Sequence, residues 1–129
     1  MSLEEALELL GPESWESVCQ AYLIIEHHFV PTGLATGRTL PGVDIVGRRS
    51  TDGVRILAQC KKDPNPDCIS DKFQEVIADL TGSDLAFYFA FGGCTDEVPA
   101  NVRVIDRDAI RNWSKSKNGD RYFEWLFGA

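Results

Sequence analysis

The 129-residue chain has no long apolar run, no C-x-x-C pair and no excess of positive charge. No apolar stretch approaches the roughly 18 residues that a membrane-spanning helix needs, so we expect no contact with a membrane. Its four cysteines are too widely spaced for a typical structural zinc site, and a 43% hydrophobic share makes a disulfide framework unnecessary. Because the N-terminus also lacks the basic and apolar regions of a secretory signal, we expect a cytoplasmic protein with reduced thiols.

The absence of net positive charge also limits the partners that the chain can have. A formal net charge of −7 disfavours avid, non-specific binding to a phosphate backbone. Gly92-Gly93 lacks the surrounding G-x-x-x-x-G-K pattern of a phosphate-binding loop and indicates a turn. Basic residues nevertheless form two local groups, which comprise Arg48, Arg49, Arg55, Lys61 and Lys62, and then Arg107, Arg111, Lys115, Lys117 and Arg121.

The length of the chain allows one domain with a single core. We expect a helical extension over residues 1–11, a core over 12–117 and an apolar tail over 118–129. The tail either completes the core or forms a contact with a second copy. The order of the elements predicts an α/β fold in which helices flank both faces of a mixed central sheet. The expected elements are helices over 3–10, 12–28, 71–81 and from 107, and strands over 40–47, 54–61, 85–91 and 102–105.

Capping residues indicate where the helices begin. Ser2 and Glu5 match a capping box, and Pro12 suits the first turn of the next helix. Ser70 and Asp106 are good N-caps for the two later helices.

A hairpin is the sharpest structural signal in the chain. The two β-prone runs over 40–47 and 54–61 are joined by a segment that ends in Asp52-Gly53, a dipeptide typical of tight turns. Residues that oppose one another in an antiparallel ladder have a constant sum of residue numbers and point to the same face. A turn centred between Thr51 and Asp52 gives a sum of 103, and a turn centred on Asp52-Gly53 gives 105.

Both registers bring three polar side chains together. The first register opposes Asp44 to Gln59, and the second opposes Asp44 to Lys61. Either one predicts that the three side chains share a face of the sheet, unless a one-residue bulge intervenes. Such polar groups on a sheet covered by helices are costly unless they satisfy one another or bind a ligand.

Metal binding is one way to satisfy these groups. Asp44, Gln59 and the backbone carbonyl of Cys60 would provide oxygen ligands that suit Mg²⁺ or Mn²⁺. Lys61 would then orient an attacking water and offset negative charge in a phosphoryl transition state. The alternative is a cross-strand ion pair between Asp44 and Lys61 with Gln59 hydrogen-bonded beside it.

At these residues the chain resembles the PD-(D/E)xK nuclease superfamily, and it is most similar to the branch related to the Mrr restriction enzymes, in which Gln often replaces the second acidic residue. The resemblance rests on the segments 42–46 (GVDIV) and 56–62 (ILAQCKK), and it extends over roughly residues 13 to 116 in the same order of elements. It implies a restriction-endonuclease-like fold and Mg²⁺-dependent hydrolysis of DNA. Asp44 and Gln59 would hold the metal, and Lys61 would act on the water.

The resemblance also implies a glutamate on the first core helix near the metal, and Glu16 occupies that position. Glu26 on the same helix is an alternative, and a solvent-facing role also fits Glu16. The chain departs from the family in the missing second acidic ligand, which predicts weak metal binding, and in an approach to Asp44 (residues 36–42) that is poor in acidic residues. It also has no visible DNA-recognition domain. Either a second copy, another subunit or a further domain reads the DNA, or the chain keeps the nuclease fold with little or no activity.

Overall fold

The computed structural model describes residues 2–32 and 41–128. Within these ranges no helix is both long and apolar enough to cross a membrane. The elements in chain order are α1 (Leu3–Leu9), α2 (Pro12–His27), β1 (Phe29–Pro31), β2 (Ile45–Arg49), β3 (Arg55–Lys61), α3 (Asp71–Ala78), β4 (Leu85–Ala90), β5 (Val102–Ile105), α4 (Arg107–Ser114) and α5 (Lys117–Phe127).

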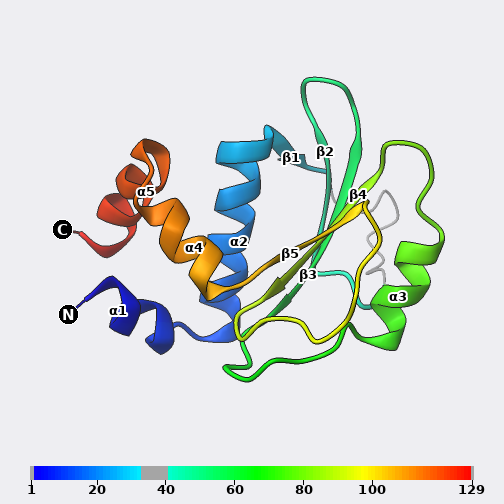
Figure 1. The fold of residues 1–129 in the computed structure, drawn as a ribbon. Coiled ribbons are helices and arrows are strands. Elements are labelled where there is room, and N and C mark those ends of the chain that lie inside the picture. The colour runs from blue at the N-terminus through cyan, green and yellow to red at the C-terminus, as the bar shows by residue number, and fades with distance from the viewer. Residues whose placement is uncertain (1, 33–40, 129) are drawn as a thin grey trace.

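The described strands form one five-stranded mixed sheet in the order β1-β2-β3-β4-β5. Strands β1, β2 and β3 pair antiparallel, whereas β3, β4 and β5 pair parallel. The parallel pairing of β3 with β4 requires a crossover connection, and α3 provides it. Helix α3 lies on one side of the sheet, and α1, α2, α4 and α5 lie on the other (Figure 1). The expected α/β class with helices on both faces is therefore confirmed.

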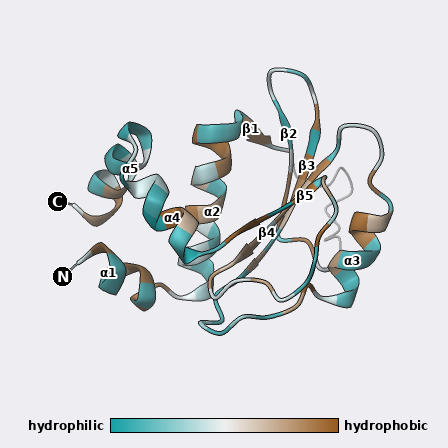
Figure 2. Cartoon of the chain, viewed as in Figure 1, coloured by the Kyte–Doolittle hydropathy of each residue, from teal (hydrophilic) through white to brown (hydrophobic). Residues whose placement is uncertain are grey.

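Two apolar clusters cover the two faces of the sheet. The larger one joins α2 to the sheet and contains Trp15 and Phe89, both fully buried, and the smaller one forms around Phe73 of α3. The strands of the sheet are largely hydrophobic, whereas the helices carry both hydrophobic and hydrophilic residues (Figure 2). Strand β4 is buried along nearly its whole length, as its continuous apolar run predicts.

The helix starts follow the capping residues. The Ser2 hydroxyl accepts a hydrogen bond from the Glu5 backbone N–H at 3.1 Å, and Pro12 opens α2. The Ser70 hydroxyl accepts from the Phe73 N–H at 3.2 Å, and the Asp106 carboxylate accepts from the Ala109 N–H at 2.8 Å. These four predictions are confirmed because a cap depends on residues close together in the chain.

Two boundaries differ from the expected ones by several residues, and the tail forms a helix that the expected elements did not include. Strand β2 begins at Ile45, whereas the run over 40–47 predicted an earlier start. Residues 41–44 precede the strand as a turn and a bend, and residues 36–40 of the approach to Asp44 lie outside the described residues. Helix α3 ends at Ala78, four residues before Gly82. The apolar tail forms α5, whose Phe123 is buried in the larger cluster.

Candidate functional site

Asp44 lies immediately before β2 and is bound to β3 through both its backbone and its side chain. Its N–H donates to the carbonyl of Ala58 at 2.8 Å, and its carboxylate accepts from the backbone N–H of Cys60 at 2.7 Å. The carboxylate therefore takes the place that a further residue of β2 would occupy in the ladder. It lies against the stretch of β3 between Gln59 and Lys61.

The hairpin has the first of the two expected registers. Ile45 pairs with Ala58, which gives the sum of 103. The N–H of Asp44 also donates to Ala58, so two consecutive residues oppose one residue of β3, as in a β-bulge. The expectation of a single shared face assumed a regular ladder up to Asp44, and the ladder is irregular there. Such an irregularity re-aims a side chain.

The charge of Asp44 acts on a glutamate of α2. Glu16 of α2 has a raised pKa, first because burial removes part of its hydration, then because of the nearby charge of Asp44, and third because of Glu13. The charge of Asp44 is therefore near enough to Glu16 to contribute to its raised pKa. This arrangement favours Glu16 over the alternative Glu26.

Glu26 has a structural partner instead. Its carboxylate accepts a hydrogen bond from the Trp113 indole N–H at 2.9 Å. It lies ten residues beyond Glu16 on the same helix, a separation of about 15 Å at 1.5 Å per residue. Glu26 therefore joins α2 to α4 and lies away from Asp44.

Gln59 is the buried polar residue of β3, with 7% of its surface exposed. Its side-chain N–H donates to the Ser70 hydroxyl at 2.8 Å, which places it against the start of α3. Among the described residues its Oε1 has no hydrogen-bond partner. A buried acceptor without a partner costs free energy, and a metal ion or a water would satisfy it.

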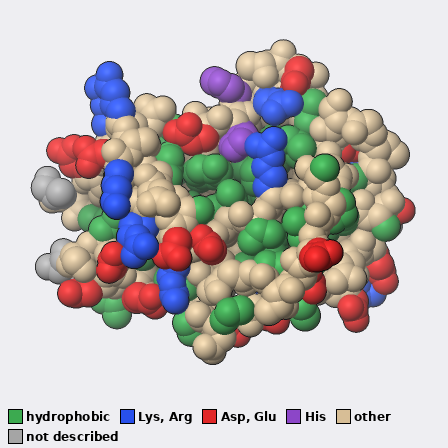
Figure 3. Space-filling view, viewed as in Figure 1, with side chains coloured by type: hydrophobic (Ala, Val, Ile, Leu, Met, Phe, Trp, Pro, Cys, Tyr) green, Lys and Arg blue, Asp and Glu red, His purple; other side chains and the backbone are tan. Residues whose placement is uncertain are grey.

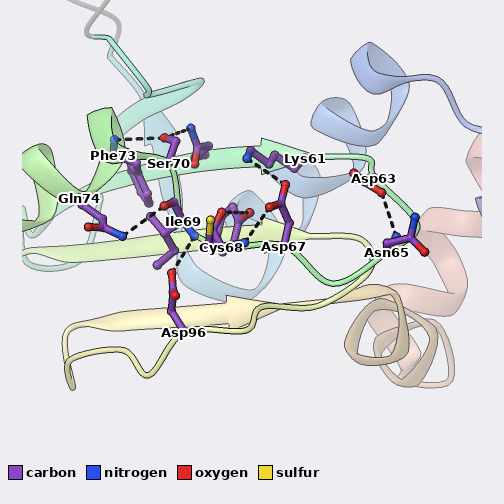
Figure 4. Close-up of polar contacts among 12 residues, drawn as sticks. Lys61, Asp63, Asn65, Asp67, Cys68, Ile69, Ser70, Phe73, Gln74 and Asp96 are labelled. Carbon is purple, nitrogen blue, oxygen red and sulfur yellow. Dashed lines mark hydrogen bonds and ion pairs between the residues drawn. The ribbon is translucent and has the colours of Figure 1, made fainter.

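Lys61 is paired with an acidic residue of the loop after β3. Its Nζ lies 3.2 Å from the carboxylate of Asp67, and the two side chains face one another in Figure 4. The pKa of Asp67 is lowered, chiefly because its carboxylate accepts the backbone N–H of Cys68 and then because of Lys61. The cross-strand ion pair considered as an alternative, between Asp44 and Lys61, is thus replaced by a pair with a loop residue.

The loop before α3 is held in place by polar groups of other segments that the sequence did not single out. The Tyr88 hydroxyl donates to the carbonyl of Cys68 at 3.1 Å, and the Asp96 carboxylate accepts from the Ile69 N–H at 2.8 Å (Figure 4). Burial, and next the charge of Asp67, raise the pKa of Tyr88. Tyr88 stands beside Gln59 in the parallel register of β3 and β4. In this region the sequence predicted only Ser70, as a helix cap. The contacts of an irregular loop follow no periodic pattern in the sequence.

The oxygen ligands that the sequence predicts lie on or beside β3, but Glu16 comes from α2, and Gln59 lies against the start of α3 on the other side of the sheet. Within the described ranges no group of three or more His, Cys, Asp or Glu residues could hold a metal ion. The carboxylates of Asp44 and Glu16 are two charged donors, and the unpaired Oε1 of Gln59 is a neutral one. In an extended strand the carbonyl of a residue points to the same side as its N–H, so the Cys60 carbonyl faces the edge at which Asp44 is bound.

Comparisons of the chain with protein-family models, with curated proteins and with solved structures find no match.

Proposed function

We propose that the chain is a metal-dependent nuclease domain that hydrolyses DNA phosphodiester bonds. The observation that carries the proposal is the carboxylate of Asp44, fixed on the Cys60 N–H at 2.7 Å. Glu16 of α2 is near it, since burial first and then the charge of Asp44 raise the pKa of Glu16. Residues whose pKa is shifted by burial together with a neighbouring charge cluster at functional sites. The family resemblance assigns metal binding to Asp44 and Gln59, and it implies a glutamate near that site at the position of Glu16.

The order of the elements supports a restriction-endonuclease-like fold. A helix, an antiparallel three-stranded unit, a crossover helix and a parallel strand follow one another from α2 to β4. This order agrees with the one that the resemblance implies. The candidate residues then lie at the strand that joins the antiparallel part of the sheet to the parallel part.

Each residue has a role in this proposal. Asp44 and Glu16 would hold Mg²⁺ or Mn²⁺, with Gln59 and the carbonyl of Cys60 as neutral ligands. When bound, the metal acts as a Lewis acid and lowers the pKa of a water. Lys61, released from Asp67 by an approaching phosphate, would orient the water and offset the charge of the transition state.

Cleavage of supercoiled plasmid tests the proposal. The chain should nick the plasmid with Mg²⁺ or Mn²⁺ and not with EDTA. Lys61→Ala should bind Mn²⁺ as the parent does and should lose cleavage. Lys72→Ala is a matched control, because Lys72 is an exposed lysine of α3 whose acidic neighbour, Glu75, is 4.0 Å away. Equal cleavage by the Lys61 variant and its parent would rule out the assigned role.

A second candidate is a nuclease-fold module that binds DNA or a protein without turnover. The pairing of Lys61 with Asp67 and of Gln59 with Ser70 favours it, because both side chains already have partners. The acidic net charge favours it too. Titration with Mn²⁺ discriminates between the two candidates: saturable binding that Asp44→Ala removes supports the enzyme, and no binding supports the module.

A further inference from the structure

A stripe of basic side chains runs along α4 and continues over α5 (Figure 3). Arg107, Arg111 and Lys115 are spaced four residues apart, so they lie on one side of the helix. Lys62 joins them from the end of β3, since its Nζ lies 3.9 Å from the centre of the Phe91 ring that Arg107 also covers. Lys62, Arg107, Arg111 and Lys115 together form the basic stripe.

Acidic groups of α1 occupy part of this stripe. The Glu8 carboxylate lies 3.2 Å from Arg107, and the Glu4 carboxylate lies 2.8 Å from Arg111. Glu4 and Glu8 are themselves four residues apart, so two carboxylates on one side of α1 match two guanidinium groups on one side of α4. Arg111 also forms an ion pair with Asp108 of its own helix, at 3.0 Å. The carbonyl of Glu8 also accepts a hydrogen bond from Lys62 at 3.0 Å.

The stripe begins at the end of the sheet where the candidate site lies. Lys61 and Lys62 are consecutive, and the Lys61 carbonyl accepts from the Phe91 N–H at 2.9 Å. The carbonyl of Phe91 in turn accepts from the Arg107 N–H at 3.1 Å. Two hydrogen bonds thus connect the backbone of Lys61 to the first α4 residue of the stripe.

The contact of α1 with the stripe is of a kind that a competing anion can replace. Its ion pairs are between half-exposed side chains, and pairs of this type contribute little net free energy and weaken with salt. A cavity of about 170 Å³ lies between α1 and α4, lined by Leu7, Phe91 and the charged groups already named. Arginine forks bind phosphate with the same geometry as carboxylate.

We propose that the basic stripe receives the phosphate backbone of a DNA strand beside the candidate site, and that Glu4 and Glu8 of α1 occupy the positions of two phosphates until DNA arrives. The proposal rests on the proposed function for the identity of the ligand. It explains how a chain of net charge −7 accepts a polyanion: binding exchanges internal carboxylates for phosphates on the same cations.

The test measures DNA binding without cleavage. The full chain, in EDTA, is titrated into a fluorescent DNA duplex at several salt concentrations, and anisotropy gives the dissociation constant. The double variant Glu4→Gln/Glu8→Gln frees the two arginines, and we expect about tenfold tighter binding and a salt slope steeper by about 1 to 2, since each phosphate contact contributes about 0.9. Glu5→Gln/Glu97→Gln is the control, because it removes two exposed carboxylates and leaves the pairs with Arg107 and Arg111 intact.

The outcomes separate this proposal from the nuclease proposal. Two results together support the stripe, even if no variant cleaves DNA. Glu4→Gln/Glu8→Gln binds DNA more tightly whereas its control does not, and this gain is lost when Arg107→Gln/Arg111→Gln is added to it. Equal binding by the Glu4/Glu8 variant and its control overturns it, even if the parent cleaves plasmid. Circular dichroism and thermal unfolding of each variant confirm that the fold is retained.

Discussion

The carboxylate of Asp44 accepts the backbone N–H of Cys60 at 2.7 Å, so an acidic side chain takes the place of a strand backbone at the edge of β3. This hydrogen bond gives Asp44 a structural role in addition to any role in metal binding. The two roles make different demands on the side chain, because the hydrogen bond needs an acceptor oxygen and the metal needs a charge.

Substitutions at Asp44 should separate the two roles. Asp44→Asn keeps an acceptor for the Cys60 N–H and should leave the free energy of unfolding nearly unchanged, while Mn²⁺ binding is lost. Asp44→Ala should also lose Mn²⁺ binding. Because it removes the acceptor, it should in addition lower the free energy of unfolding by about 1 kcal/mol. Urea unfolding and Mn²⁺ calorimetry measure the two effects. Unchanged Mn²⁺ affinity in Asp44→Asn would remove Asp44 from the list of ligands.

The raised pKa of Glu16 predicts a pH dependence of stability. Folded Glu16 keeps its proton to a higher pH than unfolded Glu16, so its favourable contribution is complete below the ordinary value of 4.5 and is lost as the pH rises through the raised pKa. Glu16→Gln should therefore match its parent at low pH and become the more stable protein as the pH rises. Urea unfolding at a series of pH values checks this.

Glu5→Gln on α1 sets the baseline for that experiment, because Glu5 is an exposed glutamate on another helix. Asp44→Asn should also lower the pKa of Glu16, since it removes the second cause of the shift. A carbon NMR titration of the Glu16 carboxyl group reports this directly. A Glu16 pKa that does not respond to Asp44→Asn would contradict the pairing of the two carboxylates.

The unpaired Oε1 of Gln59 predicts different effects for two substitutions. Gln59→Met removes the buried oxygen together with the bond to Ser70, and we expect a change of less than about 1 kcal/mol in the free energy of unfolding. Gln59→Glu places a charge in the same buried position and should lower the melting temperature without metal. Added Mn²⁺ should restore the melting temperature of the Gln59→Glu variant, because a ligand that binds the folded state stabilises it. Thermal unfolding with and without Mn²⁺ checks both, and a melting temperature of Gln59→Glu that does not respond to Mn²⁺ would place the metal elsewhere.

Two aromatic residues of α5 should respond differently to truncation. Phe123 is buried against Trp113, with 5.6 Å between the ring centres, whereas Trp125 is 77% exposed. Phe123→Ala should cost about 3 kcal/mol or more, and Trp125→Ala should change stability by less than about 0.5 kcal/mol. Denaturant unfolding of the two variants checks this. Sedimentation of Trp125→Ala also tests a homodimer, because a contact between copies at this residue would be weakened.

The elements of the fold were largely predictable because their signals are local. Ser70 and Asp106 cap helices through bonds to residues three positions ahead, and the turn after Arg49, whose carbonyl accepts the Gly53 N–H at 2.8 Å, sets the register of the hairpin. The run over 85–91 is apolar on both faces, and β4 is buried on both faces. Each of these features is decided by residues close together in the chain.

The arrangement around Asp44 was not predictable, because it depends on contacts distant in sequence. Gly42 has a φ of +78°, and a Cβ at this position would lie 2.8 Å from both Lys72 Cβ and the Phe73 nitrogen of α3. The packing of α3 thus sets the path of the chain into β2, and with it the irregular pairing of Asp44. The partner of Lys61 was missed for the same reason, since Asp67 lies in a loop whose shape no periodic pattern describes.

Strand β3 is bonded antiparallel to β2 and parallel to β4, and this has a consequence for the order in which the protein folds. The hairpin closes over a few residues, whereas the pairing of β3 with β4 must wait for a much longer connection to close, which is entropically slower. We therefore expect Asp44 to reach Cys60 in the first step and Gln59 to meet Tyr88 in the second. On this expectation the two halves of the candidate site form at different times along the folding reaction.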